Sequence, residues 1–229
     1  MRNVGVELQL NTVNVQTKDF TWETGFTFSK NHNELIELYG GKKDDVTNKW
    51  FIGEPIDVNY DYVFDGIWQT DEAEQAAVYG QKPGQVKVRD IDGNKVIDAD
   101  DKQILGQRSP KWIGSITSTF RYKDFDLSVY LYTQQGAQVQ DAFMSSFMTF
   151  EGNYNQLDVD YWTENNPSNE FPQPGNKGKY YDTMRYIDVS FVRVGSITLG
   201  WNIPKEWTKK IGIKNARLYF TTNNPFTFS

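Results

Sequence analysis

Cysteine is absent from the 229 residues of the chain and histidine occurs only once, which excludes several kinds of site. Without thiols the chain has no disulfide, no thiolate-bound metal and no cysteine nucleophile. The lone His32 cannot form an imidazole zinc site, and its position at a strand end favours a surface polar residue over a catalytic base. The glycine spacing of nucleotide-binding loops is missing as well. We therefore expect no enzyme, no redox chemistry and no organic cofactor.

Positive charge is scarce: 24 Lys and Arg stand against 30 Asp and Glu, for a net charge of −6. A nucleic-acid partner is not expected, because phosphate neutralisation needs a basic face. Long apolar runs are also lacking, which excludes membrane-spanning helices. Strands that alternate apolar and polar residues can still cross a membrane without forming such a run.

Aromatic residues are abundant, with 13 Tyr, 15 Phe and 7 Trp, and they fall mainly in short alternating runs. A period of two is typical of strands with one apolar and one polar face. In the first run Val4 and Leu8 lie on one predicted face, and Glu7 and Gln9 lie on the other. The predicted strands are residues 3–14, 20–31, 111–121, 125–135, 187–203 and 215–223.

The connections between these strands alternate between short and long. Residues 15–19, 122–124 and 204–214 are short connections, whereas 32–110 and 136–186 are far longer than the usual turn. An antiparallel up-and-down sheet places every second connection at the same end. We therefore predict an all-β fold with both long connections at one end of the sheet.

One stretch of the first long connection has the pattern of a calcium-binding loop. Asp90, Asp92, Asn94, the Val96 carbonyl and Asp101 occupy positions 1, 3, 5, 7 and 12, whose oxygen atoms surround Ca²⁺ in such loops. Position 6, usually glycine because its backbone is left-handed, is a lysine here, at a cost of about 1 kcal/mol. The alternative is a turn rich in Asp and Asn whose side chains bind its own backbone.

Several stretches together resemble a known family over nearly the whole chain. They are residues 3–8 (NVGVEL), 64–69 (FDGIWQ), 82–85 (KPGQ) leading into 90–94 (DIDGN), 161–165 (YWTEN), and 193–201 (RVGSITLGW) followed by Ile203-Pro204. In sequence, order and spacing these stretches are similar to the C-terminal part of the barrel of SusC-like TonB-dependent outer-membrane transporters of Bacteroidota.

This resemblance implies a segment of a 22-stranded transmembrane β-barrel in the outer membrane of a Gram-negative bacterium, with long folded extracellular loops. Residues 1–229 would be an incomplete C-terminal segment of the barrel, without the plug domain. The implied partners are a SusD-like surface lipoprotein, TonB through the missing N-terminal part, a glycan, oligosaccharide or peptide solute, and outer-membrane lipid. Polar strand residues would line the solute route, among them Glu7, Gln9, Glu23, Thr117 and Arg121.

The resemblance also divides the aromatic residues into two groups. Trp22, Trp112 and Trp201 lie near strand ends, where aromatic girdles anchor barrels at the lipid interface. The loop residues are expected to contact the solute or the SusD-like lipoprotein, which acts as a lid, with burial inside a folded loop as the alternative. They are Trp50, Trp68, Trp162, Tyr180 and Tyr181.

Two other function classes stay open from the residues alone. The first is a soluble β-sandwich carbohydrate-binding module with a structural calcium ion, in which apolar strand faces would pack against each other. The second is a glycosidase fragment, although no pair of carboxylates is marked by a motif. The faces of the strands distinguish these readings, since a barrel exposes its apolar face to lipid.

Overall fold

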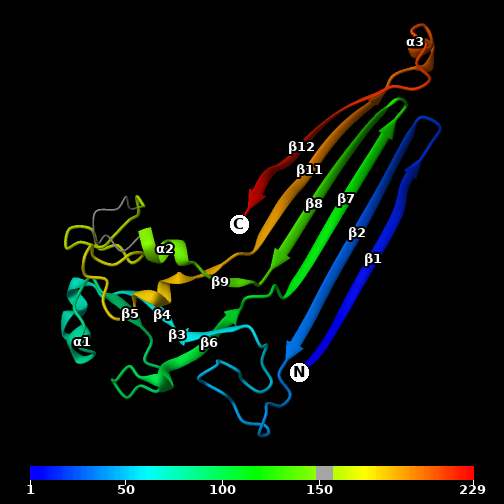
Figure 1. Ribbon diagram of the computed structural model, residues 1–229. Coiled ribbons are helices and arrows are strands. Elements are labelled where there is room, and N and C mark those ends of the chain that lie inside the picture. Colours follow the sequence, from blue (N-terminus) through cyan, green and yellow to red (C-terminus); the bar gives the residue numbers. More distant parts are fainter. Residues whose placement is uncertain (148–156) are drawn as a thin grey trace.

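The computed structural model describes residues 1–147 and 157–229, and one antiparallel sheet dominates it (Figure 1). All six predicted strands are present in this sheet, side by side in chain order. Residues 148–156 of the predicted connection 136–186 lie outside the described residues. The strands of the sheet are β1 (Arg2–Gln16), β2 (Phe20–Glu34), β7 (Trp112–Tyr122), β8 (Phe125–Gln135), β11 (Phe191–Asn202) and β12 (Arg217–Phe228).

The predicted distribution of connections is confirmed. The short turns after β1, β7 and β11 lie at one end of the sheet, and both long connections lie at the other end (Figure 1). Strand boundaries differ from the prediction at several ends, and most at the start of β11 and the end of β12. The run 187–203 is interrupted because the Asp188 carboxylate accepts a hydrogen bond from the Ser190 N–H at 2.6 Å, which turns the chain before β11. The last strand continues to Phe228, because Pro225 falls at a bulge opposite Gly195 and needs no ladder partner.

The register of the sheet aligns residues of like polarity. One row runs Leu10–Phe26–Ile116–Leu131–Val194 across five neighbouring strands, so the apolar side chains share a face. Because side chains alternate along a strand, the adjacent rows place hydroxyl and charged groups together on the opposite face. The sheet therefore has one apolar and one polar face over its whole width.

The apolar face is not the core of the described chain. Val6 and Leu8 of β1 are 65% and 52% exposed, and Phe125 of β8 is 50% exposed. Leu127 and Leu131, on the predicted apolar row of β8, are half-buried between neighbouring strands. Within residues 1–147 and 157–229, no second sheet pairs with or covers this one. The packing that the sandwich alternative requires is therefore not found there.

The buried core lies instead within the long connections, at one end of the sheet (Figure 1). There the chain forms short paired strands and single helical turns, and no helix in the described residues is long and apolar enough to cross a membrane. These elements are β3 (Val58–Tyr62), β4 (Phe64–Ile67), α1 (Ala73–Val78), β5 (Val86–Val88), β6 (Lys102–Gln107), β9 (Gln138–Gln140), α2 (Ala142–Phe147) and β10 (Tyr186–Asp188), with 3-10 helices at Thr70–Glu72, Ala99–Asp101 and Tyr181–Arg185. The short connection after β11 contains α3 (Lys205–Lys209).

Candidate functional site: the junction of the two long connections

The two long connections, far apart in sequence, are joined by a shared apolar core. Ile67 and Val86, from the paired strands β4 and β5, pack with Trp162 and Tyr181 of the second connection, and each of these side chains is less than 5% exposed. Burial of large apolar side chains is the main favourable term in folding such a region. The core therefore holds the two connections in one arrangement.

Hydrogen bonds across the junction add a specific register. The Gln69 side-chain carbonyl accepts a hydrogen bond from the Trp162 indole N–H at 3.0 Å, and its amide donates to the backbone carbonyls of Ile67 and Ser168. From the other side, the Asn169 Oδ1 accepts a hydrogen bond from the Ile67 N–H at 2.7 Å. Polar groups in a partly buried junction are costly when unpaired, so these bonds specify how the loops meet.

Gly84 brings its backbone close to the second connection. Its φ angle is +82°, and a Cβ atom built there would lie 2.6 Å from the Trp162 ring and 2.9 Å from Gln173 Cβ. Its N–H donates to the Trp68 carbonyl, and its own carbonyl accepts from the Gln173 N–H, both at 2.8 Å. Only glycine combines this backbone conformation with this ring contact.

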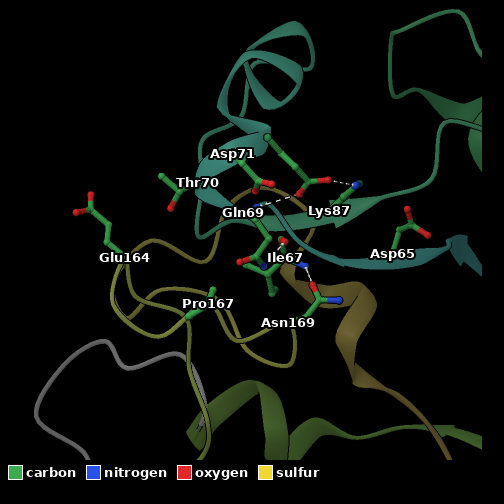
Figure 2. Close-up of a pocket in the computed structure, with 10 residues that line it drawn as sticks. Asp65, Ile67, Gln69, Thr70, Asp71, Lys87, Glu164, Pro167 and Asn169 are labelled. Atoms are coloured by element: carbon green, nitrogen blue, oxygen red, sulfur yellow. Dashed lines mark hydrogen bonds and ion pairs between the residues drawn. The ribbon is translucent and has the colours of Figure 1, made fainter.

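An open cleft of about 780 Å³ lies at the surface of the junction (Figure 2). Figure 2 shows Thr70 and Asp71 on one side and Glu164 on the opposite loop. The lining residues come from both connections and are Asp65, Ile67, Gln69, Thr70, Asp71, Glu72, Lys87, Glu164, Pro167 and Asn169. Four carboxylates thus face one ammonium group, which disfavours an anionic ligand.

That single cation is already engaged. The Lys87 ammonium lies 2.7 Å from the Glu72 carboxylate and 4.5 Å from the centre of the Trp68 ring. Burial raises the pKa of Glu72, but hydrogen bonds from Lys87 and the Gln69 N–H outweigh it, so the pKa lies below its ordinary value. Glu72 is therefore ionised at neutral pH and pairs with Lys87.

The predicted aromatic contacts are largely inside this junction. Trp68, Trp162, Tyr180 and Tyr181 are between 3% and 6% exposed, whereas Trp50 is 37% exposed. This burial favours the alternative reading for the first four, in which the rings pack within a folded loop. Contact of these residues with solute stays a prediction.

The predicted calcium loop forms a compact turn, and the left-handed backbone expected at Lys95 is present with φ of 67°. Carboxylate oxygens of Asp90, Asp92 and Asp101 lie within 4.8 Å of one another. Oxygen ligands that lie about 2.3–2.6 Å from a common Ca²⁺ are separated by up to about 5 Å, so these three positions fit one ion. The Asn94 Oδ1 accepts a hydrogen bond from the Val96 N–H at 2.7 Å.

The same loop is also well bonded to its own backbone. Asp90 accepts hydrogen bonds from the N–H groups of Gly93 and Lys95 at 2.7 and 2.8 Å, and Asp101, which is fully buried, accepts from those of Ile91 and Asp98. Burial raises the pKa of Asp90, but these backbone bonds outweigh it and leave the pKa below its usual value. The geometry is thus compatible with both readings of the loop, and calcium stays a prediction.

The polar face of the sheet carries the residues predicted to line a solute route. Arg121 of β7 lies 2.6 Å from the Glu23 carboxylate of β2, and Arg217 of β12 lies 2.6 Å from Asp126 of β8. The last pair passes over Gly200, whose missing side chain leaves room for it. Hollows of about 480 and 420 Å³ lie along this face, and their linings include the predicted residues Glu7, Gln9, Glu23 and Thr117.

Sequence reasoning did not identify the cleft residues Gln69, Lys87 and Asn169. Gln69 ends one of the stretches that carry the family resemblance, which was the one available signal. Its role depends on pairing with a loop about a hundred residues away, and no local pattern encodes that contact.

Comparisons with known proteins cover the whole chain. It is 29% identical over its full length to TonB-dependent receptor P3 of Formosa agariphila, and 28% identical to TonB-dependent receptor SusC of Bacteroides thetaiotaomicron. The chain spans about a quarter of the length of these curated relatives, 24% and 23% respectively. No family model matches it.

Solved structures support the similarity to TonB-dependent receptors at the level of the fold. The structure of the RagAB peptide transporter superposes with a TM-score of 0.77 over 99% of this chain and 26% of that chain, at 22% identity. The RagAB peptide importer in its closed-closed state gives a TM-score of 0.71 at 21% identity. The similarity to TonB-dependent receptors extends over the whole of this chain. Together with the two-faced antiparallel sheet and the long loops at one end of it, this similarity identifies the chain as a segment of a SusC-like TonB-dependent receptor.

Proposed function

We propose that this chain is part of the barrel wall and extracellular loops of an outer-membrane importer for glycans, oligosaccharides or peptides. In this proposal the complete protein has an N-terminal part that contacts TonB, and a SusD-like surface lipoprotein covers the loops. The relatives are named as receptors and transporters, which supports import and not catalysis.

The observation that carries the proposal is the two-faced sheet. An exposed apolar face over all six strands suits lipid, while the opposite face offers hydroxyls and ion pairs to water. The strands are 11 to 15 residues long. An 11-residue strand tilted by about 45° rises about 26 Å, close to the apolar band of outer-membrane barrels.

Reactivity of cysteines introduced on adjacent residues tests this assignment directly, since this chain has no cysteine of its own. Ile116 lies on the apolar face and Thr117 on the polar face of the same strand. In the full-length receptor, without other cysteines, Thr117→Cys should react with a water-soluble maleimide in intact outer membranes. Ile116→Cys should react only after unfolding, because lipid excludes the reagent and keeps the thiol protonated. Equal reaction rates in membranes would contradict the proposal.

Import itself is tested by deleting the complete gene and measuring uptake of labelled oligosaccharides and peptides. Loss of uptake of one class, restored by the gene, would identify that class as the solute. Unchanged uptake of both classes would contradict import. Purification of the tagged receptor from membranes, followed by mass spectrometry, would detect the proposed lipoprotein partner.

The cleft is proposed as a contact for neutral or cationic solutes, because its exposed acids repel anions. Asp71→Asn with Glu164→Gln should slow uptake of lysine-rich peptides more than uptake of neutral ones. Glu37→Gln with Glu54→Gln, at exposed acids of the first connection outside the cleft lining, is the matched control. An equal effect of both pairs would remove the cleft from the solute route.

Calcium binding is proposed to stabilise the loop at Asp90–Asp101 on the extracellular side. The close approach of three carboxylates, which costs repulsion without a cation, supports it. The chemistry is that of a hard ion bound by oxygen atoms, and its effect would be confined to this loop.

A further inference from the structure

The connection between β11 and β12 has a charge opposite to that of the long connections. Residues 203–216 contain four lysines and one glutamate, for a net charge of +3. Residues 35–111 and 136–190 contain 13 Lys and Arg against 23 Asp and Glu, for a net charge of −10. The sheet therefore separates an acidic end from a basic end, and α3 marks the basic end in Figure 1.

This basic connection is folded, although it is mostly exposed. The Thr208 side chain is 2% exposed, and the Thr208 carbonyl accepts hydrogen bonds from the N–H groups of Ile211 and Ile213. The Ile203 N–H donates to the Ala216 carbonyl at 2.9 Å, which closes the base of the connection. The shape of its surface is thus set by backbone bonds before any ligand arrives.

A hollow of about 440 Å³ lies on this connection, and lysines ring it. Its lining consists of Lys205, Lys209, Gly212, Ile213, Lys214 and Asn215. Among the described residues none of these lysines forms an ion pair. Three unpaired ammonium groups around one hollow attract an anion with several oxygen atoms, such as a phosphate group.

Beside the hollow, aromatic rings lead directly to the apolar face of the sheet. The Trp207 ring, 57% exposed, meets Trp201 edge-on at 6.0 Å, and Trp201 stacks on Phe125 at 5.9 Å. Ile211 is 72% exposed on the same connection. Tryptophan prefers the boundary between lipid tails and head groups, so this arrangement places the lysines at head-group level.

We propose that this hollow binds the phosphate head group of an anionic phospholipid, in the leaflet next to the short turns, with Trp207 and Ile211 against its acyl chains. The inference rests on the proposed membrane location of the sheet. The lysine stems can lie along the lipid boundary while their ammonium groups reach the phosphate. A basic site with an apolar border suits a lipid better than a free anion, which gains nothing from the exposed rings.

Native mass spectrometry of the full-length receptor tests this proposal, with phosphatidylglycerol and phosphatidylethanolamine as competing probes. The wild-type receptor should retain phosphatidylglycerol preferentially. Lys205→Gln, Lys209→Gln and Lys214→Gln together should reduce that preference by about tenfold or more, since each lysine near an anionic lipid surface favours binding by about fivefold. The corresponding triple arginine variant should keep the preference, and Trp207→Ala should lower retention of both lipids.

The matched control replaces three exposed lysines of the first long connection, Lys42, Lys43 and Lys49, by glutamine. It removes the same charge from the acidic end and should leave lipid retention unchanged. Equal retention of the two lipids by the wild type would overturn the proposal. So would an equal loss of phosphatidylglycerol retention in the glutamine variant of the hollow and in this control variant. Displacement of phosphatidylglycerol by inorganic phosphate alone would assign the hollow to free anions and overturn it too. The cysteine reactivity test uses other residues, so it can succeed when this one fails.

Discussion

Replacing Gly84 by alanine should loosen the junction of the two long connections. The new methyl group would meet the Trp162 ring at 2.6 Å and Gln173 Cβ at 2.9 Å, far inside normal contact. The left-handed backbone at this position costs a further ~1–2 kcal/mol for an L-residue. With about 1–3 kcal/mol for overpacking a buried contact, the total loss of local stability is about 2–5 kcal/mol.

Gly80→Ala is the matched control, because it separates the two contributions. Gly80 follows α1 with a similar φ angle of +66°, but a Cβ atom there would meet nothing within 4 Å. Its substitution should cost only the backbone strain, about 1–2 kcal/mol. The difference between the variants, about 1–3 kcal/mol, therefore measures the ring contact alone.

Hydrogen exchange on the full-length receptor measures this difference. The Trp162 N–H, bonded to the Phe171 carbonyl at 2.9 Å, and the Gln173 N–H report opening of the junction. Both should exchange about 5- to 150-fold faster in Gly84→Ala than in Gly80→Ala, because 1.4 kcal/mol corresponds to a tenfold change. Amides of the six-stranded sheet should be unaffected in both. Equal exchange in the two variants would refute the packing argument.

Two further predictions concern charge. Calorimetry of the full-length receptor with millimolar calcium should give binding heat that disappears in Asp90→Ala. The heat should persist in Asp45→Ala, which changes a different acidic turn. An identical response in all three proteins would show that the loop is an ordinary turn without calcium. Acidification should loosen the contact between Glu72 and Lys87: the pKa of Glu72 is lowered in the folded state from 4.5, so its contribution is complete above that pH and is lost as the pH falls below it. Relative to its intrinsic rate at each pH, exchange of the Gln69 N–H, which donates to Glu72, should therefore become faster below pH 4.5 in the wild type. The same ratio should not change in Glu72→Gln.

The sequence by itself determined the sheet, its strand order and the end at which the long connections lie. Alternation such as Val4-Gly5-Val6-Glu7 is a local property with a period of two, and a one-residue shift would reverse every face, so the pattern constrains register strongly. The lengths of the connections then left little freedom in the order of neighbouring strands. The acidic turn was equally local, and its left-handed Lys95 followed from position alone.

Only the tertiary structure decided which loop aromatics are buried and where a cleft forms. Trp50 and Trp162 look alike in the sequence, yet Trp162 is enclosed because residues around Ile67 and Gln69 pack on it from about ninety positions away. Non-local contacts of this kind depend on how two long segments fold against each other. The periodic pattern of residues in the sequence does not encode that arrangement. The basic hollow at Lys205–Lys214 is similar: its lysines are visible in the sequence, but their convergence follows from backbone bonds that close the connection upon itself.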